Sequence, residues 1–311
     1  MNNPLAGSEA GNPVPLQEKA GPHTANGADP QGPETAFGRP RNAMGNRYAY
    51  AVISQRARGL SLGVNLNPDK RCNFDCVYCE VNRDEPPKER TVDVGTMAAE
   101  LTHLLDLARR NELRRLAWFR NLPPELLQLK EVALSGDGEP TLCPNFSEVV
   151  GEVLSIRSRA EHPFFKIVLI TNATGLDTRE VAHGLRRLAR EDEIWVKLDA
   201  GTPEYMNKVN RPSVPLWRIL ANILTVARER PVIIQSLFPL INRQAPPLDE
   251  IEQYVERLKE LTVAGAQIAM VQVYSAHRPP HRPQCEHLPL KTLSHIARRV
   301  REVTGLKAEV F

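Results

Sequence analysis

Short apolar segments alternate with amphipathic ones along this sequence from about Tyr48 onward. Six of the apolar segments are rich in Val and Ile and are bounded by turn residues, which is the pattern of buried strands. The predicted strands are Ser61–Leu66, Glu131–Ser135, Lys166–Thr171, Ile194–Asp199, Val232–Phe238 and Ile268–Tyr274.

Between the predicted strands, apolar residues recur at intervals of three and four, as they do on the buried face of a helix. Four such stripes are Met97, Leu101, Leu104 and Ala108; Leu216, Ile219, Ile223 and Ala227; Leu248, Ile251, Val255 and Leu258; and Leu293, Ile296, Val300 and Val303. Ser213 followed by Pro215 predicts a helix start, and Asp177 or Thr178 predicts another before Val181.

Strands that alternate with helices form parallel sheets with right-handed crossovers. Six such units are fewer than the eight that close a full barrel. The periodicity therefore fits either an open, partly closed barrel or a doubly wound sheet. In both architectures the functional edge lies at the carboxyl ends of the strands.

Polar residues gather at that edge of the predicted sheet. The segment 72–79 follows the first strand and the run SGDGEPT follows the second. Thr171 and Asn172 end the third strand, and Lys197 and Asp199 end the fourth. Because these ends meet along one edge, we expect the residues to form a single site.

Composition limits the class of protein further. The chain has 311 residues, of which 41% are hydrophobic and 25% charged, as in ordinary globular proteins. A net charge of +3 is too small to argue for nucleic acid by itself. Residues 1–45 are rich in Pro, Gly, Ala and Asn, so we expect a disordered tail there and one domain over residues 46–311. Nothing in the sequence reads as a secretory signal or a membrane span.

The five cysteines favour a metal site over disulfides. Their number is odd, and three of them, Cys72, Cys76 and Cys79, fall within eight positions. This usage predicts a reducing, cytoplasmic environment. The CxxxCxxC spacing supplies three thiolates where a cubane cluster normally takes four, so one iron would be left open for chemistry. The alternative is a zinc site completed by Cys143, Cys285 or a histidine.

The cysteine spacing, with Tyr78 just before the last cysteine, resembles the signature of the radical S-adenosylmethionine (SAM) superfamily. The runs Ser61–Leu66 and Ser135–Leu142, together with Arg278-Pro279-Pro280, are similar to Fe–S oxidoreductases grouped with wyosine-base synthases. The resemblance covers about residues 47 to 311. It implies an open (β/α)6 partial TIM barrel with a [4Fe–4S] cluster on the three cysteines.

The same resemblance implies the chemistry. SAM would chelate the open iron, and one electron from the reduced cluster would cleave it to a 5′-deoxyadenosyl radical that abstracts hydrogen from the substrate. A one-electron donor such as a flavodoxin or ferredoxin is implied, without a membrane. The substrate stays unidentified, with a tRNA nucleobase or a small molecule as candidates.

The run Gly136-Asp137-Gly138-Glu139 resembles the superfamily's motif for the methionyl amino group of SAM. Glycines let a backbone approach a ligand, and a carboxylate accepts hydrogen bonds from an ammonium group. Asp137 between the glycines departs from the usual form, so either carboxylate could make the contact. The alternative is a tight structural turn.

Other polar residues in apolar strands also need partners. In an open barrel these partners would be SAM or the substrate. The residues concerned are Thr171, Asn172, Lys197, Asp199 and Gln235. An internal salt bridge to a neighbouring acid is an equal alternative for Lys197. Tyr78 is predicted to pack on adenine or to cover the cluster.

Two further segments carry weaker patterns. His277, His281, Cys285 and His287 lie in a Pro-rich run that we interpret as a stiff loop beside the site, although a second metal is conceivable. Residues 109–120 combine five arginines with Trp118 and Phe119. We expect a solvated helix face whose aromatic residues dock on the core, and base stacking is the alternative. The rival function is a non-catalytic RNA-binding protein with a structural metal.

Overall fold

Eight strands form one sheet in the order β1-β2-β3-β4-β5-β6-β8-β10. The computed structural model describes residues 44–84, 89–278 and 280–311, which belong to one compact unit. The strands of the sheet are β1 (Ala49–Ser54), β2 (Gly59–Asn65), β3 (Leu129–Ser135), β4 (Lys166–Thr171), β5 (Glu193–Lys197), β6 (Val232–Leu237), β8 (Ile268–Tyr274) and β10 (Ala308–Val310). A separate antiparallel pair joins β7 (Pro239–Leu240) and β9 (Glu286–His287).

The strand order decides between the two predicted architectures. From β2 to β10 all neighbours are parallel, and only β1 runs antiparallel to its neighbour β2. The order follows the sequence without reversal, whereas a doubly wound sheet reverses at a switch point. The open partial barrel is therefore confirmed.

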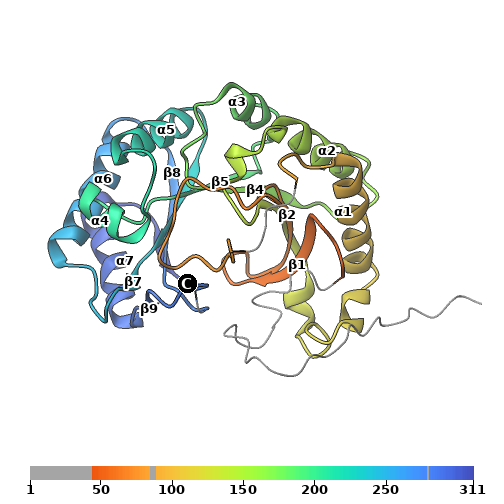
Figure 1. The fold of residues 1–311 in the computed structure, drawn as a ribbon, viewed down its shortest axis with the longest axis horizontal. Coiled ribbons are helices and arrows are strands. Elements are labelled where there is room, and N and C mark those ends of the chain that lie inside the picture. Colours follow the sequence, from red (N-terminus) through yellow and green to blue (C-terminus); the bar gives the residue numbers. More distant parts are fainter. Residues whose placement is uncertain (1–43, 85–88, 279) are drawn as a thin grey trace, which may run out of the picture. The chain divides into compact units, whose positions relative to one another are not determined.

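The helices lie along the outer side of the strands, from α1 round to α7 (Figure 1). They are α1 (Val94–Arg109), α2 (Phe146–Ser158), α3 (Arg179–Leu185), α4 (Pro203–Val209), α5 (Leu216–Glu229), α6 (Leu248–Val263) and α7 (Leu290–Thr304). Short 3-10 helices are η1 (Glu112–Arg115), η2 (Pro124–Leu127) and η3 (Pro140–Leu142). Among the described residues, no helix is long and apolar enough to cross a membrane.

Most predicted elements are present with small differences. All six predicted strands exist, and β4 and β8 have the predicted bounds. Thr178 caps α3 by accepting a hydrogen bond from Val181 N, as predicted. Ser213 does not cap α5, because Pro215 occupies that position. Leu248, placed in a buried stripe, is 71% exposed. Of the predicted disordered tail, residues 1–43 lie outside the described residues.

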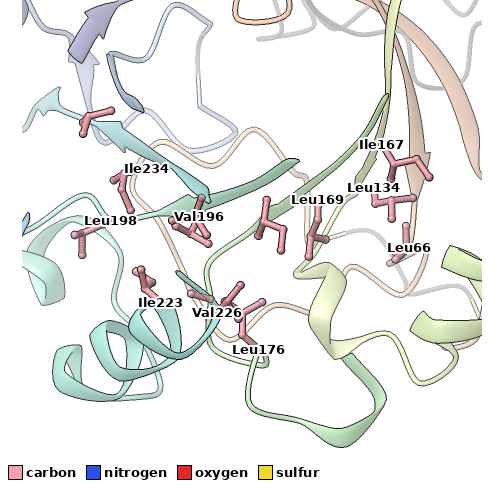
Figure 2. Close-up of a cluster of buried hydrophobic side chains, with 14 of the residues drawn as sticks. Leu66, Leu134, Ile167, Leu169, Leu176, Val196, Leu198, Ile223, Val226 and Ile234 are labelled. Atoms are coloured by element: carbon pink, nitrogen blue, oxygen red, sulfur yellow. The ribbon is translucent and has the colours of Figure 1, made fainter. Parts of the chain in front are cut away.

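The main core lies between the sheet and the helices (Figure 2). Leu134, Leu169, Val196 and Ile234 come from four successive strands and are fully buried. Since side chains alternate along a strand, their neighbours point to the opposite face. We call that face, away from the helices, the inner face of the sheet.

The inner face mixes apolar and polar side chains. A separate apolar cluster is formed by Val168, Trp195 and Ile233. Lys166 Nζ pairs with Glu193 Oε1 at 2.7 Å, and Trp195 Nε1 donates to the other oxygen of the same carboxylate at 2.7 Å. Charged groups within this face are thus tied to one another by direct contacts.

Glu131 on β3 is a deeply buried acid of this face. Its side chain is 1% exposed, and Oε1 accepts a hydrogen bond from Ser61 Oγ at 3.0 Å. Burial raises the pKa of Glu131 from the ordinary 4.5 to about 7, because the charged form is poorly solvated. The folded protein therefore keeps a proton that the unfolded chain releases at lower pH.

We expect Glu131→Gln to flatten the pH dependence of stability. For the wild type, the free energy of unfolding falls as pH rises through the window from 4.5 to about 7. Glu131→Gln has no proton to lose. Its free energy of unfolding should therefore rise by about 2–3 kcal/mol relative to that of the wild type between about pH 5 and about pH 8. Urea unfolding at several pH values measures this difference. The exposed Glu125→Gln is the matched control, and parallel curves for Glu131→Gln and wild type would contradict the argument.

Candidate functional site

The three clustered cysteines lie in the segment that follows β2, here called the cysteine loop (residues 66–84). This loop has little regular structure of its own and pairs with the chain after α4. Asp75 N donates to Asn210 O, and Val77 N donates to Val209 O, both at 2.9 Å. The loop is therefore held at the carboxyl edge of the sheet by backbone hydrogen bonds.

Each cysteine of the loop carries a free thiol with an N–H donor near its sulfur. All three are partly buried. The donors are Asn172 Nδ2 to Cys72 Sγ (3.9 Å), Asn210 Nδ2 to Cys76 Sγ (3.4 Å) and Arg83 Nη2 to Cys79 Sγ (3.9 Å). Amide and guanidinium donors favour a negatively charged sulfur, which is the form that binds iron.

Burial has the opposite effect on two of these thiols. It raises the pKa of Cys72, and it raises the pKa of Cys76 to about 12, where the nearby Asp199 carboxylate adds to the shift. A metal that binds here must displace these protons. Within the described ranges, no three His, Cys, Asp or Glu side chains converge around a point as they do for a single metal ion.

The predicted Gly136–Glu139 turn packs directly against the cysteine loop. Glu139 N donates to Arg71 O at 2.9 Å. A Cβ on Gly138 would lie 2.0 Å from Arg71 O, and a Cβ on Gly136 would lie 2.4 Å from Asn65 Oδ1. Neither glycine has a positive φ, so the close approach alone requires them. The two glycines therefore leave room for the cysteine loop, which packs against them.

Glu139 is turned into the protein, where it is 3% exposed. Its Oε1 accepts hydrogen bonds from Thr141 N (3.0 Å), Thr141 Oγ1 (2.6 Å) and Thr171 Oγ1 (2.5 Å). Its Oε2 accepts one from Asn172 N at 2.7 Å. Burial nevertheless raises the pKa of Glu139. This carboxylate joins the turn after β3 to the end of β4, whereas Asp137 Oδ2 accepts from Asn65 Nδ2 at 2.9 Å.

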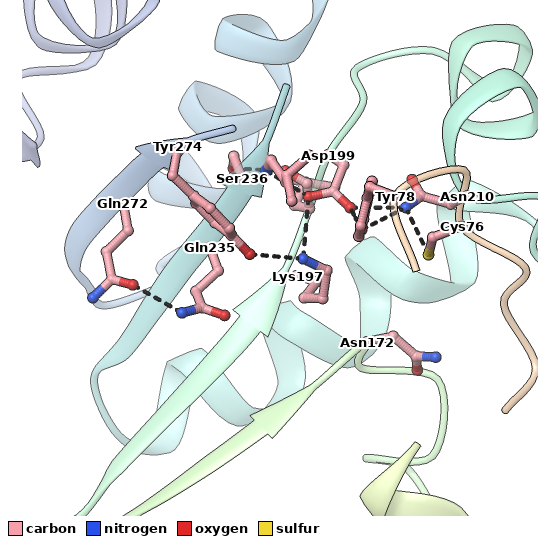
Figure 3. A network of polar contacts seen from close by, with 12 residues as sticks. Cys76, Tyr78, Asn172, Lys197, Asp199, Asn210, Gln235, Ser236, Gln272 and Tyr274 are labelled. Carbon is pink, nitrogen blue, oxygen red and sulfur yellow. Dashed lines mark hydrogen bonds and ion pairs between the residues drawn. The ribbon is translucent and has the colours of Figure 1, made fainter. Parts of the chain in front are cut away.

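Asp199 is the centre of a second buried network (Figure 3). Its Oδ1 accepts from Leu237 N at 2.8 Å, and its Oδ2 accepts from Asn210 Nδ2 at 2.7 Å. Tyr78 OH also donates to Oδ2. Burial and the adjacent Asp199 carboxylate hold the pKa of Tyr78 well above its usual value, so the phenol keeps its proton. Asp199 thereby connects β5, β6, the end of α4 and the cysteine loop.

Lys197 completes this network on the inner face. Its Nζ lies 3.6 Å from Asp199 Oδ1 and donates to Tyr274 OH at 3.0 Å. Burial disfavours the ammonium, but the attraction of Asp199 and the contact with Tyr274 outweigh it, so the pKa of Lys197 is raised. The internal salt bridge considered for Lys197 is thus present. Gln235, the cross-strand neighbour of Lys197, donates from Nε2 to Gln272 Oε1 at 2.9 Å.

Sequence reasoning missed several of the contacting residues. Asn210 ends α4 without any motif, and Arg83 follows Cys79 at a spacing that no rule singles out. Tyr274 and Gln272 interrupt the last predicted strand in the way that Gln235 interrupts its neighbour. The same reasoning about polar residues in buried strands would have found these two.

The Pro-rich segment lies beside the cysteine loop, as interpreted. His281 N donates to Cys79 O at 2.8 Å, and Cys285 Sγ contacts Val77 O at 3.5 Å. In the arginine-rich segment, α1 ends at Arg109 and a 3-10 helix follows. Phe119 there is 2% exposed, which confirms that it docks on the core. Cys143 is also buried.

An open parallel barrel with a three-cysteine loop at the carboxyl edge of its strands defines the class of protein. The chain belongs to the radical SAM superfamily, whose sequence profile matches residues 66–243, more than half of its length. Membership implies an iron–sulfur cluster and SAM. Three free thiols, each with an N–H donor, fit such a cluster, and Cys72, Cys76 and Cys79 would hold it.

Individual proteins with a similar sequence or a similar fold are also known. A UPF0026 protein of Synechocystis sp. is 29% identical over 184 residues, which cover 58% of this chain and 59% of that protein. The match thus spans about three fifths of the relative. A radical SAM methyltransferase from Sphaerobacter thermophilus has a similar fold, with a TM-score of 0.58 at 16% identity over 85% of this chain and 68% of that one. The structure of TYW1 with a lysine–pyruvate adduct bound has a TM-score of 0.52 at 15% identity. That match covers 84% of this chain and 85% of the other.

We expect Gly138→Ala to impair cluster assembly although no cysteine is changed. The added Cβ would clash with the backbone oxygen of Arg71 and displace the cysteine loop. Iron per chain after anaerobic reconstitution should fall at least several-fold. Gly95→Ala is the matched control, because its Cβ would make only an ordinary 3.5 Å contact with Asp93. Full iron content in Gly138→Ala would show that the two loops pack less tightly than described.

We expect Asp199→Ala to lower the free energy of unfolding by about 3–5 kcal/mol, because it leaves Lys197 buried without its partner. Urea unfolding measures the loss. Asp177→Ala removes an exposed pair with Arg218 and should cost less than about 1 kcal/mol. Asp199→Asn keeps an acceptor for Leu237 N, so its loss in free energy of unfolding should lie between those of Asp199→Ala and Asp177→Ala. Equal losses for Asp199→Ala and Asp177→Ala would contradict a central role for Asp199.

Proposed function

We propose that this protein is a radical SAM oxidoreductase that uses a [4Fe–4S] cluster to abstract hydrogen from a substrate that is unidentified. A tRNA nucleobase and a small metabolite are the candidate substrate classes. When bound, the cluster and SAM supply a 5′-deoxyadenosyl radical by one-electron cleavage of the sulfonium. The observation that supports the proposal most is the cysteine loop at the end of the barrel. It carries three thiols, each with an N–H donor near its sulfur.

The proposed residue roles follow the two polar networks. Cys72, Cys76 and Cys79 would bind three irons and leave the fourth to SAM. The SAM pocket would be lined by Tyr78, Gly136, Asp137, Gly138, Glu139, Thr171, Asn172, Lys197, Asp199 and Gln235. Proximity of Asn172 Nδ2 to Cys72 Sγ supports a pocket on that side of the cluster.

Two carboxylates remain candidates for the methionyl ammonium. Glu139 Oε1 already accepts three hydrogen bonds, whereas Oε2 accepts one and retains acceptor capacity. Asp137 is less buried than Glu139, and its Oδ2 accepts from Asn65. A carboxylate fixed by other bonds is preorganised for a cation, which favours Glu139 with its four hydrogen bonds.

Lys197 is suited to holding charge rather than to forming covalent adducts. A lysine that attacks a carbonyl must lose its proton, which a lowered pKa makes easy. Here the pKa of Lys197 is raised, and Asp199 lies against it. The lysine–pyruvate adduct named for one structural neighbour therefore does not transfer to Lys197. We assign Lys197 to anion binding and to the orientation of Tyr274.

The surroundings of the enzyme are part of the proposal. A flavodoxin or ferredoxin would supply the electron, in the reducing environment of the cytoplasm that free thiols require. The rival function, RNA binding around a structural metal, needs aromatic side chains that can stack on bases. Of the two aromatic residues considered for stacking, Phe119 is buried in the core and Trp118 is partly buried against it.

The decisive experiment is SAM cleavage without substrate. The anaerobically reconstituted, brown protein should convert SAM to 5′-deoxyadenosine and methionine when dithionite supplies the electron. Replacing all three loop cysteines by Ala should abolish both the visible absorbance and the cleavage, because the thiolate ligands are lost. Chromatography of the products measures the yield.

The matched controls are Cys143→Ala and Cys285→Ala, which should retain iron, sulfide and cleavage. S-adenosylhomocysteine as the sole product would indicate an ordinary methyltransferase. Loss of the cluster in Cys285→Ala would mean that a fourth protein ligand closes the site. Either result would overturn the proposed function.

A further inference from the structure

Arg83 joins two parts of the cysteine loop through the two ends of its guanidinium. Its Nη1 donates to Phe74 O at 2.9 Å, and its Nη2 lies 3.9 Å from Cys79 Sγ. Phe74 stands between Cys72 and Cys76 in the sequence, so one side chain contacts both halves of the three-cysteine motif. A planar guanidinium can make both contacts at once. Arg83 is therefore held in a fixed position against the third sulfur.

The donor to Cys79 differs in charge from the donors to the other two sulfurs. Those donors, Asn172 and Asn210, are neutral amides. The guanidinium of Arg83 is a permanent cation. Burial opposes this charge, but the attraction of the Cys79 and Cys72 sulfurs outweighs burial and raises the pKa of Arg83. A full positive charge thus lies beside the sulfurs that would hold the cluster.

The acids of the cysteine loop do not neutralise Arg83. They pair with other arginines instead: Asp75 with Arg211, Glu80 with Arg278 and Asp84 with Arg282. Over the part of the chain that the structure describes, no carboxylate forms an ion pair with Arg83, whose contacts are with a sulfur and a backbone oxygen. The charge of Arg83 is therefore directed at the cysteines.

Solvent screens this charge only in part. Arg83 is partly buried, and it lines a recess between the cysteine loop and the Pro-rich segment, together with Cys79, His281 and Arg282. The recess has a volume of about 30 Å³, which is about the share of one water molecule in the liquid. Because the Coulomb interaction grows as the effective dielectric constant falls, Arg83 acts on the adjacent sulfurs more strongly than a charge in bulk water would.

Reduction adds one negative charge to an iron–sulfur cluster, so a nearby cation stabilises the reduced form. Net charge and hydrogen bonds to the sulfurs are among the factors that set cluster potentials. We propose that Arg83 is a positioning residue that raises the reduction potential of the cluster, so that a one-electron donor of the flavodoxin or ferredoxin class can reduce it. One electron leaves the donor and enters the cluster, and no bond or proton changes in this step. The assignment rests on the proposed function.

Two variants separate the charge of Arg83 from its hydrogen bonds. Arg83→Gln keeps an amide donor and removes the charge, whereas Arg83→Lys keeps the charge and removes the planar fork. Both are reconstituted anaerobically, and a mediated redox titration without SAM is followed by electron paramagnetic resonance. We expect the equilibrium constant for reduction to fall at least about tenfold in Arg83→Gln, which lowers the midpoint potential of a one-electron couple by about 59 mV. Arg83→Lys should stay within about threefold of the wild type, because the charge is kept.

Arg282→Gln is the matched control. Arg282 lines the same recess, but it and its partner Asp84 are both more than half exposed, so solvent screens the loss of its charge. Its midpoint potential should match that of the wild type.

Three results would overturn the assignment. They are an unchanged potential in Arg83→Gln, an equal fall in Arg83→Gln and Arg83→Lys, and failure of either variant to assemble a cluster, since the role would then lie in the shape of the loop. Cleavage of SAM by the wild-type protein is measured in parallel. If the wild type cleaves SAM and one of these results is found, only this inference fails, whereas a wild type without cluster or cleavage defeats the proposed function.

Discussion

The buried carboxylate of Asp199 is the interaction on which the site depends most. The cysteine loop has little regular structure, so its position must be fixed by contacts with the barrel. Asp199 supplies them by accepting hydrogen bonds from Tyr78 in the loop, from Asn210 after α4 and from Leu237 in β6. Lys197 compensates its charge. A buried carboxylate without these partners would be strongly destabilising, so the loop and the barrel stabilise each other.

A second carboxylate plays the corresponding part on the other side of the loop. Glu139 joins the turn after β3 to the end of β4, and the same turn packs on Arg71 through its glycines. Each network also reaches one sulfur, Asn172 at Cys72 and Asn210 at Cys76. Two of the three thiols are therefore positioned by side chains that the carboxylates hold. Contacts of this kind fix the orientation of the side chains that face the two sulfurs.

Sequence reasoning predicted the barrel strands well because buried parallel strands are short apolar runs with clear ends. It missed β1, whose pairing with β2 is antiparallel, and the three-residue β10, which leaves too little pattern to detect. Sequence reasoning also pointed to polar residues at the strand ends, such as Asp199. Their partners were not, because hydrogen bonds such as Asn210 to Asp199 depend on where loops fold back in space. Pattern and spacing along the sequence carry no information about which loops meet in space.

The inner face of the sheet shows how buried charged groups are accommodated in this fold. Buried ions are tolerated when each finds a partner, and the two lysines of this face do so within the chain. Arg56 is accommodated differently, because its guanidinium packs on the Tyr274 ring while its buried Nε has no hydrogen-bond partner among the described residues.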